Sequence, residues 1–136
     1  MNREIKFRGK NKDIGWVFGQ LAYGLNGETY IIEEVELDNS YGLEETILYP
    51  VMWHRVSPDT IGQYTGLHDK NGKEIYEGDI VKSFFVDIDE EGNEVYKYRT
   101  IKVKYDAVLC WYNIDNFMNL EVIGNIYDNP ELLVGE

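Results

Sequence analysis

Four carboxylates in the middle of the chain have a spacing that could hold a divalent metal ion. They are Asp69, Glu74, Glu77 and Asp79. Oxygen ligands of this kind bind Mg²⁺ or Ca²⁺, and such an ion could activate water in a metal-dependent hydrolase. Turn formation explains the same residues more simply, because Asp69 and Asp79 can accept hydrogen bonds from nearby backbone amides while Gly72 and Gly78 supply unusual φ values. We prefer the turn interpretation and assign no metal ligand.

A run of alternating aromatic and basic residues is the second candidate site. It comprises Tyr96, Lys97, Tyr98, Arg99, Lys102 and Lys104. Such a strand could stack single-stranded bases on its tyrosines. Tyrosine and arginine are also favoured at protein interfaces, and the acidity of the surrounding chain favours a protein partner over nucleic acid. These residues are therefore a candidate interaction surface, with single-stranded nucleic acid as the alternative ligand.

The remaining reactive residue types form no known catalytic pattern. His54 and His68 are the only histidines, and no His-x-x-x-His, His-Glu-x-x-His or paired-cysteine spacing is present. Gly-x-Ser-x-Gly, Walker and dinucleotide-binding motifs are absent as well. Cys110 is the only cysteine, and its apolar neighbours predict a small buried residue rather than a reactive thiol. We therefore predict no catalytic residue and no cofactor, and we expect a protein that is not an enzyme.

The charge of the chain is strongly negative and unevenly distributed. Its 136 residues carry a net charge of -12, which disfavours general binding to nucleic acid. Residues 1–12 hold five basic residues and one acid, whereas no Lys or Arg lies between Lys12 and Arg55. A basic arm beside an acidic half could dock onto a second copy of the chain, although a solvated acidic face explains the same pattern.

The chain contains no secretory signal and no transmembrane run. A single cysteine also fits a reducing compartment. These features predict a soluble cytoplasmic protein without membrane contact.

Short β-strands should position these residues. Alternating apolar and polar residues predict a first strand that contains Ile5 and Phe7 and ends at Gly9, followed by strands at 16–23, 29–37, 46–56, 83–88, 95–105 and 120–127. Pro50 lies inside one of them and predicts an edge position or a bulge, since proline cannot donate to a ladder. Residues 129–133 should form a closing turn.

Asn-Gly pairs mark the connections between the strands. Asn26-Gly27 and Asn71-Gly72 predict tight hairpins in which both central residues take positive φ, and a third hairpin centres on residues 90–93. The apolar pattern changes phase within 95–105, because Tyr96 and Tyr98 fall on one face and Ile101 on the other. A bulge near Arg99-Thr100 would bring both sets to the core. Residues 106–120 fit a helix or a strand, and strand is preferred.

Many short strands with frequent turns predict a mainly β fold. The expected architecture is one domain over residues 1–136, built from antiparallel hairpins, with a small SH3-like or barrel-like C-terminal unit. The break at Ser57-Pro58-Asp59-Thr60 suggests a subdivision into an N-terminal β region, 1–57, and a C-terminal barrel-like region, 58–136. The same four residues could instead begin a helical turn.

Several segments together resemble one known family. They are Ile5-Lys-Phe-Arg-Gly-Lys10, Trp16-Val-Phe-Gly-Gln-Leu21, Ile61-Gly-Gln-Tyr-Thr-Gly-Leu67, Asp69-Lys-Asn-Gly-Lys-Glu-Ile-Tyr-Glu-Gly-Asp-Ile-Val81, Glu121-Val-Ile-Gly-Asn-Ile-Tyr127 and Asn129-Pro-Glu-Leu-Leu133. The match touches both ends and the middle of the chain and is similar to the YopX family of phage and prophage proteins. The resemblance implies a β-rich, homo-oligomeric protein of a phage or an integrated element in a bacterium. It implies no activity and transfers no site residue.

Three functional hypotheses follow. The first is a non-enzymatic phage accessory protein that assembles with itself and binds a host or phage protein. The second is a single-stranded nucleic-acid-binding protein, and the third is a metal-dependent hydrolase.

Overall fold

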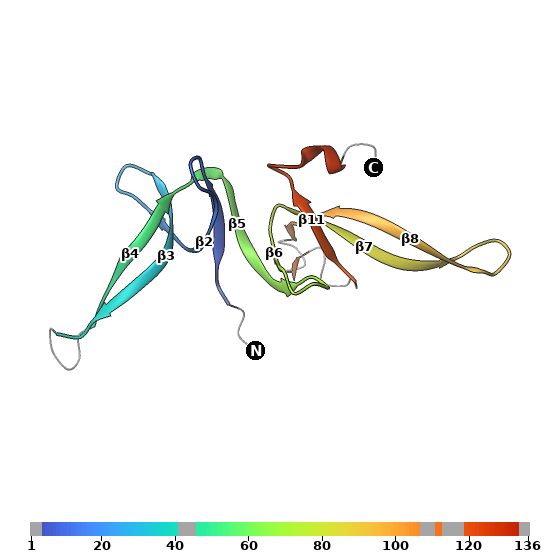
Figure 1. The fold of residues 1–136 in the computed structure, drawn as a ribbon, viewed down its shortest axis with the longest axis horizontal. Coiled ribbons are helices and arrows are strands. Elements are labelled where there is room, and N and C mark those ends of the chain that lie inside the picture. The colour runs from blue at the N-terminus through green and yellow to red at the C-terminus, as the bar shows by residue number, and fades with distance from the viewer. Residues whose placement is uncertain (1–3, 41–45, 107–110, 113–118, 134–136) are drawn as a thin grey trace. The chain divides into compact units, whose positions relative to one another are not determined.

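The computed structural model describes residues 4–40, 46–106, 111–112 and 119–133 (Figure 1). The strands are β1 (Phe7–Asn11), β2 (Gly15–Tyr23), β3 (Thr29–Asp38), β4 (Ile47–Arg55), β5 (Ser57–His68), β6 (Glu74–Tyr76), β7 (Asp79–Ile88), β8 (Glu94–Lys102), β9 (Tyr105–Asp106), β10 (Trp111–Tyr112) and β11 (Glu121–Asn125), and a 3-10 helix, η1, covers Pro130–Leu133. All of the strand pairs are antiparallel. The predicted mainly β class is confirmed, and η1 confirms the closing turn.

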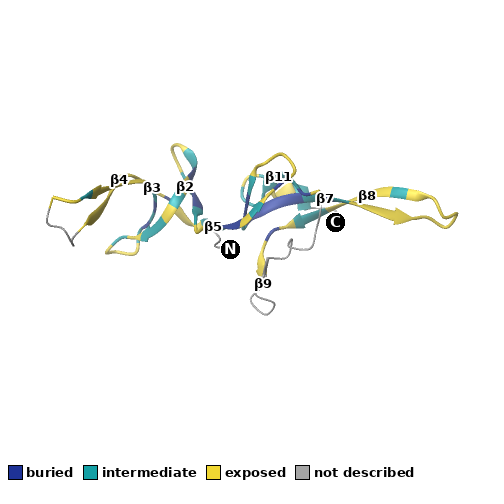
Figure 2. Cartoon of the chain, turned by 90° about the horizontal axis from the view of Figure 1, so that it is seen from below, coloured by how far each residue is buried: buried dark blue, intermediate teal, exposed yellow. Residues whose placement is uncertain are grey.

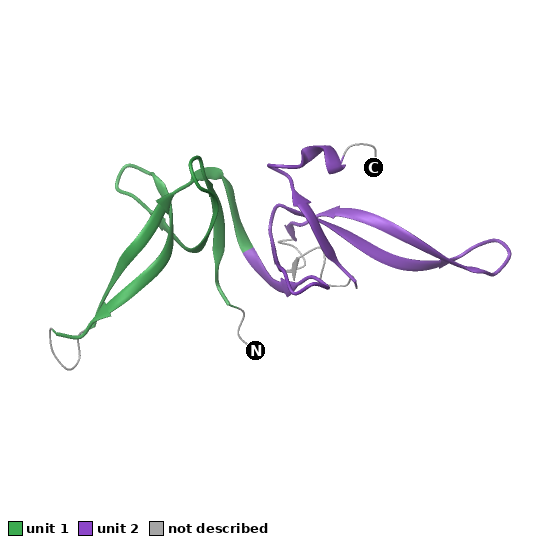
Figure 3. Cartoon of the chain, viewed as in Figure 1, with its two compact units in different colours: residues 1–63 green, residues 64–136 purple. Residues whose placement is uncertain are grey.

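The chain has two compact units, Met1–Gln63 and Tyr64–Glu136, which we call unit 1 and unit 2 (Figure 3). The boundary falls inside β5, whose first part pairs with β1 and whose last part pairs with β6. Residues 57–60, where the sequence suggested a break or a helical turn, are the first residues of β5. There the register shifts, since Lys10 pairs with Ser57 but Arg8 pairs with Gly62.

Unit 1 is an antiparallel sheet in the order β4-β3-β2-β1-β5. Its buried core consists of Val17, Ile31 and Val56, with Phe7, Leu21 and Ile61 packed against it. The prediction that the first strand ends at Gly9 is wrong, because β1 continues to Asn11. A Cβ at Gly9 would lie 2.8 Å from a Cγ of Val56, so the glycine lets that core side chain approach the strand.

Unit 2 contains a three-stranded sheet in the order β11-β7-β8. Its core gathers Ile75, Val81, Val103 and Leu120, with Leu67, Ile101 and Val122 packed against it. The pairings among the described residues leave this sheet open, so the SH3-like or barrel-like detail is not confirmed. The strands β9 and β10 pair with each other, in line with the preferred strand at 106–120. Residues 107–110 and 113–118, which include Cys110, lie outside the described residues.

Three hairpin turns share one geometry that the sequence analysis did not predict. In residues 24–28, 69–73 and 89–93 the first amide donates to the carbonyl of the fifth residue, and the fourth amide donates to the carbonyl of the first. Only the glycine at the fourth position has positive φ, for example +83° at Gly72. This is a type I turn followed by a left-handed glycine, a three-residue hairpin loop. The expectation of positive φ at both residues of the Asn-Gly pairs is therefore wrong.

The bulge expected near Arg99-Thr100 is absent. The pairing of β7 with β8 continues in register from Ile80 opposite Lys102 to Ile88 opposite Glu94. The two apolar sets of β8 therefore do lie on opposite faces. Ile101 packs against the core, whereas Tyr96 and Tyr98 stay exposed.

Long parts of two hairpins carry no buried residue (Figure 2). Every described residue of β3 and β4 from Glu33 to Arg55 is exposed or half-buried, and so is every residue from Phe84 to Lys102. Pro50 lies on β4, the outermost strand of its sheet, which confirms the predicted edge position. Val35 and Leu37, which lie on one face of β3, are 43% and 62% exposed. Among the described residues, no helix is long and apolar enough to cross a membrane.

Candidate functional site

The hairpin of β7 and β8 carries a stacked set of aromatic rings, Phe84, Tyr96 and Tyr98, which we call the aromatic face. The ring of Phe84 stacks on Tyr96 with centroids 5.3 Å apart and meets Tyr98 edge-on at 5.2 Å. Lys82 Nζ lies 4.1 Å from the centroid of the Tyr98 ring, a cation–π contact. Tyr96 and Tyr98 are each 60% exposed, so this aromatic face is open to solvent.

The alternation of β8 divides the six residues of the predicted interaction surface. Tyr96, Tyr98 and Lys102 point to the side of the aromatic face. Lys97 and Arg99 point to the opposite side, and Lys104 follows the end of the strand as an exposed residue. The structure therefore brings the two tyrosines together on one side and places Lys97 and Arg99 on the other.

On the opposite side of the hairpin, the cations of β8 contact side chains of β7. Lys97 Nζ lies 2.9 Å from Asp87 Oδ2, and the guanidinium of Arg99 lies 5.8 Å from the centroid of the Phe85 ring. The hydrogen bond from Lys97, together with an amide bond from Ile88, lowers the pKa of the Asp87 carboxyl. Both charges are half exposed, so this ion pair contributes little to stability.

A shallow pocket of about 330 Å³ lies beside the aromatic face. Its lining includes Phe84, Tyr98 and Lys82, with Lys70 and Glu121 forming an ion pair at 3.2 Å across part of its rim. An aromatic floor under cationic side chains suits a planar, electron-rich group such as a nucleobase.

Two of the four carboxylates considered as metal ligands, Asp69 and Asp79, accept hydrogen bonds from backbone amides. Asp69 Oδ1 accepts hydrogen bonds from the amides of Asn71 and Lys73, and its Oδ2 accepts one from the amide of Val122. Asp79 Oδ2 accepts from the amide of Tyr76 at 2.8 Å. Turn chemistry therefore accounts for both aspartates. Within the described ranges, no group of three or more His, Cys, Asp or Glu residues could hold a metal ion.

Burial and hydrogen bonding act in opposite directions on Asp69, which is 7% exposed. Burial raises the pKa of its carboxyl, but the amides of Val122, Lys73 and Asn71 and the charge of Lys73 outweigh that effect. The pKa of Asp69 therefore lies below its ordinary value, and the side chain is ionised at neutral pH.

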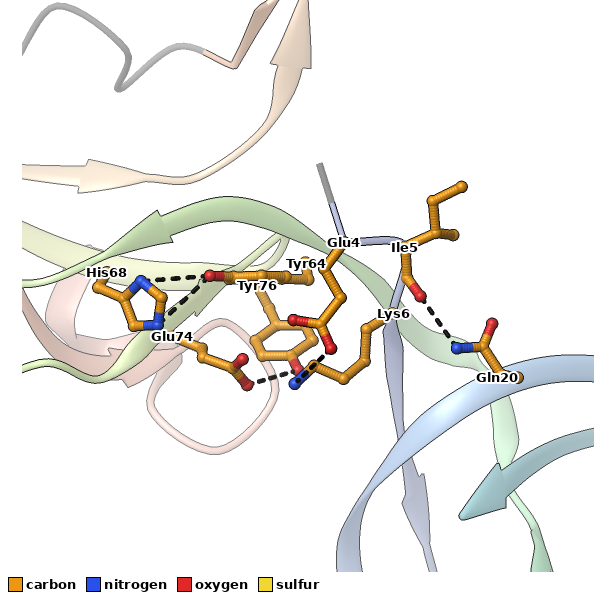
Figure 4. A network of polar contacts seen from close by, with 8 residues as sticks. All are labelled: Glu4, Ile5, Lys6, Gln20, Tyr64, His68, Glu74 and Tyr76. Atoms are coloured by element: carbon orange, nitrogen blue, oxygen red, sulfur yellow. Dashed lines mark hydrogen bonds and ion pairs between the residues drawn. The ribbon is translucent and has the colours of Figure 1, made fainter. Parts of the chain in front are cut away.

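Glu74, another residue of the carboxylate stretch, and His68 lie close to tyrosines (Figure 4). The Tyr76 hydroxyl donates to Glu74 Oε1 at 3.0 Å, and the Tyr64 hydroxyl lies 3.2 Å from His68 Nδ1. The rings of Tyr64 and His68 also meet edge-on at 5.8 Å. Glu77 follows β6 in the turn to β7. These pairs stabilise local structure and do not form an acid–base constellation with a nucleophile.

The strand β4 exposes apolar side chains on both faces of its sheet, and we call them together the β4 surface. It consists of Ile47, Leu48, Tyr49, Val51, Met52 and Trp53, which are between 37% and 62% exposed. Two polar contacts attach the strand to β3: Tyr49 donates to Glu36 at 2.9 Å, and His54 Nε2 lies 3.1 Å from Glu33. The bond to Glu36 raises the pKa of the Tyr49 hydroxyl.

Trp53 and Pro50 also line a small pocket of about 160 Å³ on unit 1, together with Ala22, Tyr30 and Ile32. Sequence reasoning missed the β4 surface, because an apolar strand pattern normally indicates burial. Pro50 was the one available signal, since it placed the strand at an edge.

Comparisons with known proteins agree with this architecture. The model of the YopX protein family matches residues 6–134. The crystal structure of protein EF1440 from Enterococcus faecalis is similar, with a TM-score of 0.59, 21% sequence identity, and coverage of 97% of this chain and 99% of that chain. At this identity the likeness concerns the fold alone. Among curated proteins, none matches the chain. Because the family model covers nearly the whole sequence, the chain belongs to the YopX family.

Proposed function

We propose that this protein is a non-enzymatic phage or prophage accessory protein that assembles with itself in the host cytoplasm and binds other proteins. The single observation that carries this proposal is the β4 surface, a row of exposed apolar side chains on the outermost strand of the unit 1 sheet. Large exposed apolar patches mark interaction sites, and an edge strand can pair with a strand of another chain.

The absence of charged side chains on most of β4 favours a second copy of the chain as the partner of this strand. Natural edge strands are usually protected by charged residues, yet from Ile47 to His54 this strand contains no Asp, Glu, Lys or Arg. Two β4 strands can therefore pair antiparallel about a twofold axis without placing like charges opposite each other. Glu33, Glu34 and Glu36 lie on β3, the inner neighbour, and leave the outer edge uncharged.

Replacing the two most exposed side chains of the β4 surface should strongly weaken self-assembly. We expect Leu48→Ser combined with Trp53→Ser to weaken the association constant by about 30-fold or more, since a buried Trp anchor contributes roughly 2 kcal/mol or more to an interface. Sedimentation velocity across a concentration series measures this change. Tyr23→Ser with Leu25→Ser is the matched control, because these large residues are even more exposed but lie outside β4. Equal sedimentation of both double variants would contradict the proposal.

Single-stranded nucleic acid binding is the second candidate function, and the aromatic face favours it. On this hypothesis we expect labelled single-stranded DNA to bind at about 50 mM salt and to be released as the salt concentration rises. Tyr98→Ala should then weaken binding about tenfold, because one stacked base contributes roughly 1–3 kcal/mol. Fluorescence anisotropy reports the affinity, with Tyr23→Ala as the control for a tyrosine exposed elsewhere. No binding by the unaltered chain at low salt would exclude this function.

A further inference from the structure

A basic pocket of about 710 Å³ lies in unit 1, where the end of β1 meets the beginning of β5. Its lining includes the cations Lys10, Lys12 and Arg55, the apolar side chains of Val56 and Pro58, and the hydroxyl of Thr60. None of the residues that line this pocket is Asp or Glu. In a chain of net charge -12, it is a local concentration of positive charge.

Hydrogen bonds hold the frame of the pocket in place. The amide of Lys10 donates to Thr60 Oγ1 at 2.8 Å, and that hydroxyl donates to the carbonyl of Ser57 at 2.6 Å. Asn11 Nδ2 donates to the carbonyl of Arg55 at 2.8 Å, which ties the turn after β1 to the segment between β4 and β5. Since Val56 belongs to the buried core, the backbone that carries the cations is fixed before any ligand binds. Such preorganisation lowers the cost of binding.

The pocket suits a compact acidic segment of protein. Its volume is far larger than a single ion needs and falls in the range of roughly 300–1,000 Å³ that accommodates sizeable ligands. An extended nucleic acid would bring many phosphates near the acidic remainder of the chain, whereas a hairpin tip presents its carboxylates at one place. Val56 and Pro58 add an apolar wall for the stems of Glu side chains.

The chain itself contains such a segment at the turn between β7 and β8, which we call the acidic tip (residues 87–94). It carries Asp87, Asp89, Glu90, Glu91 and Glu94. All eight residues are exposed. Asp89 Oδ1 accepts hydrogen bonds from the amides of Glu91 and Asn93, so the turn is ordered and presents Glu90 and Glu91 at its apex.

We propose that the basic pocket of one copy receives the acidic tip of a second copy. This inference rests on the proposed self-assembly but concerns a surface distinct from β4. The contact is heterologous, because different parts of the two copies meet, and repeated contacts of this kind close into a ring or extend as a filament. The β4 surface would supply an isologous contact beside it.

Charge exchange tests the proposal better than salt does. Each copy carries a charge of -12, so salt screens the overall repulsion between copies as well as the local attraction. The pocket variant is Lys10→Glu with Lys12→Glu, and the tip variant is Glu90→Lys with Glu91→Lys. We expect each variant alone to associate at least about tenfold more weakly than the unaltered chain in sedimentation velocity.

Mixing the two variants is the decisive measurement. The reversed pocket of one accepts the reversed tip of the other, and the unaltered pocket and tip still match, so the mixture should assemble again. Lys6→Glu with Lys73→Glu changes the net charge by the same amount outside the pocket and outside the candidate interaction surface, and should leave assembly unchanged. Lys12→Glu with Arg55→Glu replaces the pocket variant if circular dichroism shows that the first one does not fold.

The outcomes separate this inference from the proposed function. Variants that assemble like the unaltered chain, or a mixture that associates no more strongly than either variant alone, would overturn the contact between tip and pocket while leaving assembly through β4 intact. An unaltered chain that is monomeric at every concentration would overturn both. Restoration in the mixture supports the inference directly, because only contacts between copies can produce it.

Discussion

Replacing Asp69 with alanine is expected to lower the free energy of unfolding by on the order of 3 kcal/mol, the largest effect of any single side-chain truncation in a turn of this protein. The carboxylate accepts three backbone amides, from Asn71, Lys73 and Val122, at 2.9 to 3.0 Å. Without it, these part-buried donors lose an ionised acceptor. Urea unfolding followed by circular dichroism measures the loss.

Asp89→Ala is the matched control for this change. Asp89 occupies the same position in the same type of turn and accepts two amides of that turn, but it is exposed. We expect a cost of about 1 kcal/mol or less there, since water can replace the lost acceptor. Equal costs at the two positions would show that burial and the bond to Val122 contribute nothing.

The effect of Asp69 should also depend on pH with a definite sign. Its pKa is lowered in the folded protein, so the unfolded chain binds a proton first as the solution is acidified. The stabilisation is complete above the ordinary Asp pKa of about 3.9 and is lost as the pH falls through the lower value of the folded state. The difference in stability between the unaltered chain and Asp69→Ala should therefore shrink below about pH 4. A difference that stays constant down to pH 2 would contradict this assignment.

Local chemistry made the turn role of Asp69 predictable, while its distant partner was not. An Asp three residues before a Gly, between two apolar runs, indicates a capped turn from sequence alone. The bond to Val122 joins residues 53 positions apart, and it exists because the amide of Lys70 also donates to the carbonyl of Leu120 beside it. No spacing rule relates these segments, since their proximity depends on how β11 pairs with β7.

The error in the predicted burial of β8 has a physical cause. Apolar alternation assigned Tyr96 and Tyr98 to the core, although this strand extends past the core of its unit. The expected bulge at Arg99-Thr100 was needed only if both faces of β8 had to be buried. The structure keeps the regular register and leaves the aromatic face open. The alternation of side chains along the strand was therefore predictable. How far along the strand the core of the unit extends was not.

For the candidate sites, too, the features within one segment were predictable, whereas contacts between distant segments were not. The sequence placed Tyr96 and Tyr98 on one face, as the structure does, and it marked residues 1–12 as basic. It could not place Arg55 beside Lys10 and Lys12, because that proximity depends on the pairing of β1 with the beginning of β5.

Gly19→Ala is expected to be the most damaging change of a small residue, with a loss of at least about 3 kcal/mol in the stability of unit 1. At Gly19 the strand β2 changes partner, since Gly15 to Gly19 pair with β1 and Gln20 to Tyr23 pair with β3. A Cβ there would lie 1.9 Å from the carbonyl oxygen of Ile32, a backbone atom that cannot move away without breaking the ladder. The φ of +156° is also one that L side chains rarely adopt.

Gly27→Ala separates the two causes of the expected loss at Gly19, which are the steric clash of a Cβ with the carbonyl of Ile32 and the strain of a positive φ. Gly27 has φ of +88° but nothing within 4 Å of its Cβ position, so its substitution measures backbone strain alone, about 1–2 kcal/mol. Fluorescence of Trp16 and Trp53 during urea unfolding follows unit 1 in both variants once Trp111, the tryptophan of unit 2, has been replaced by Phe in each. If the two substitutions cost the same, the close approach of Gly19 to the carbonyl of Ile32 is not rigid, and the missing Cβ at Gly19 is not what lets β2 pack against β3.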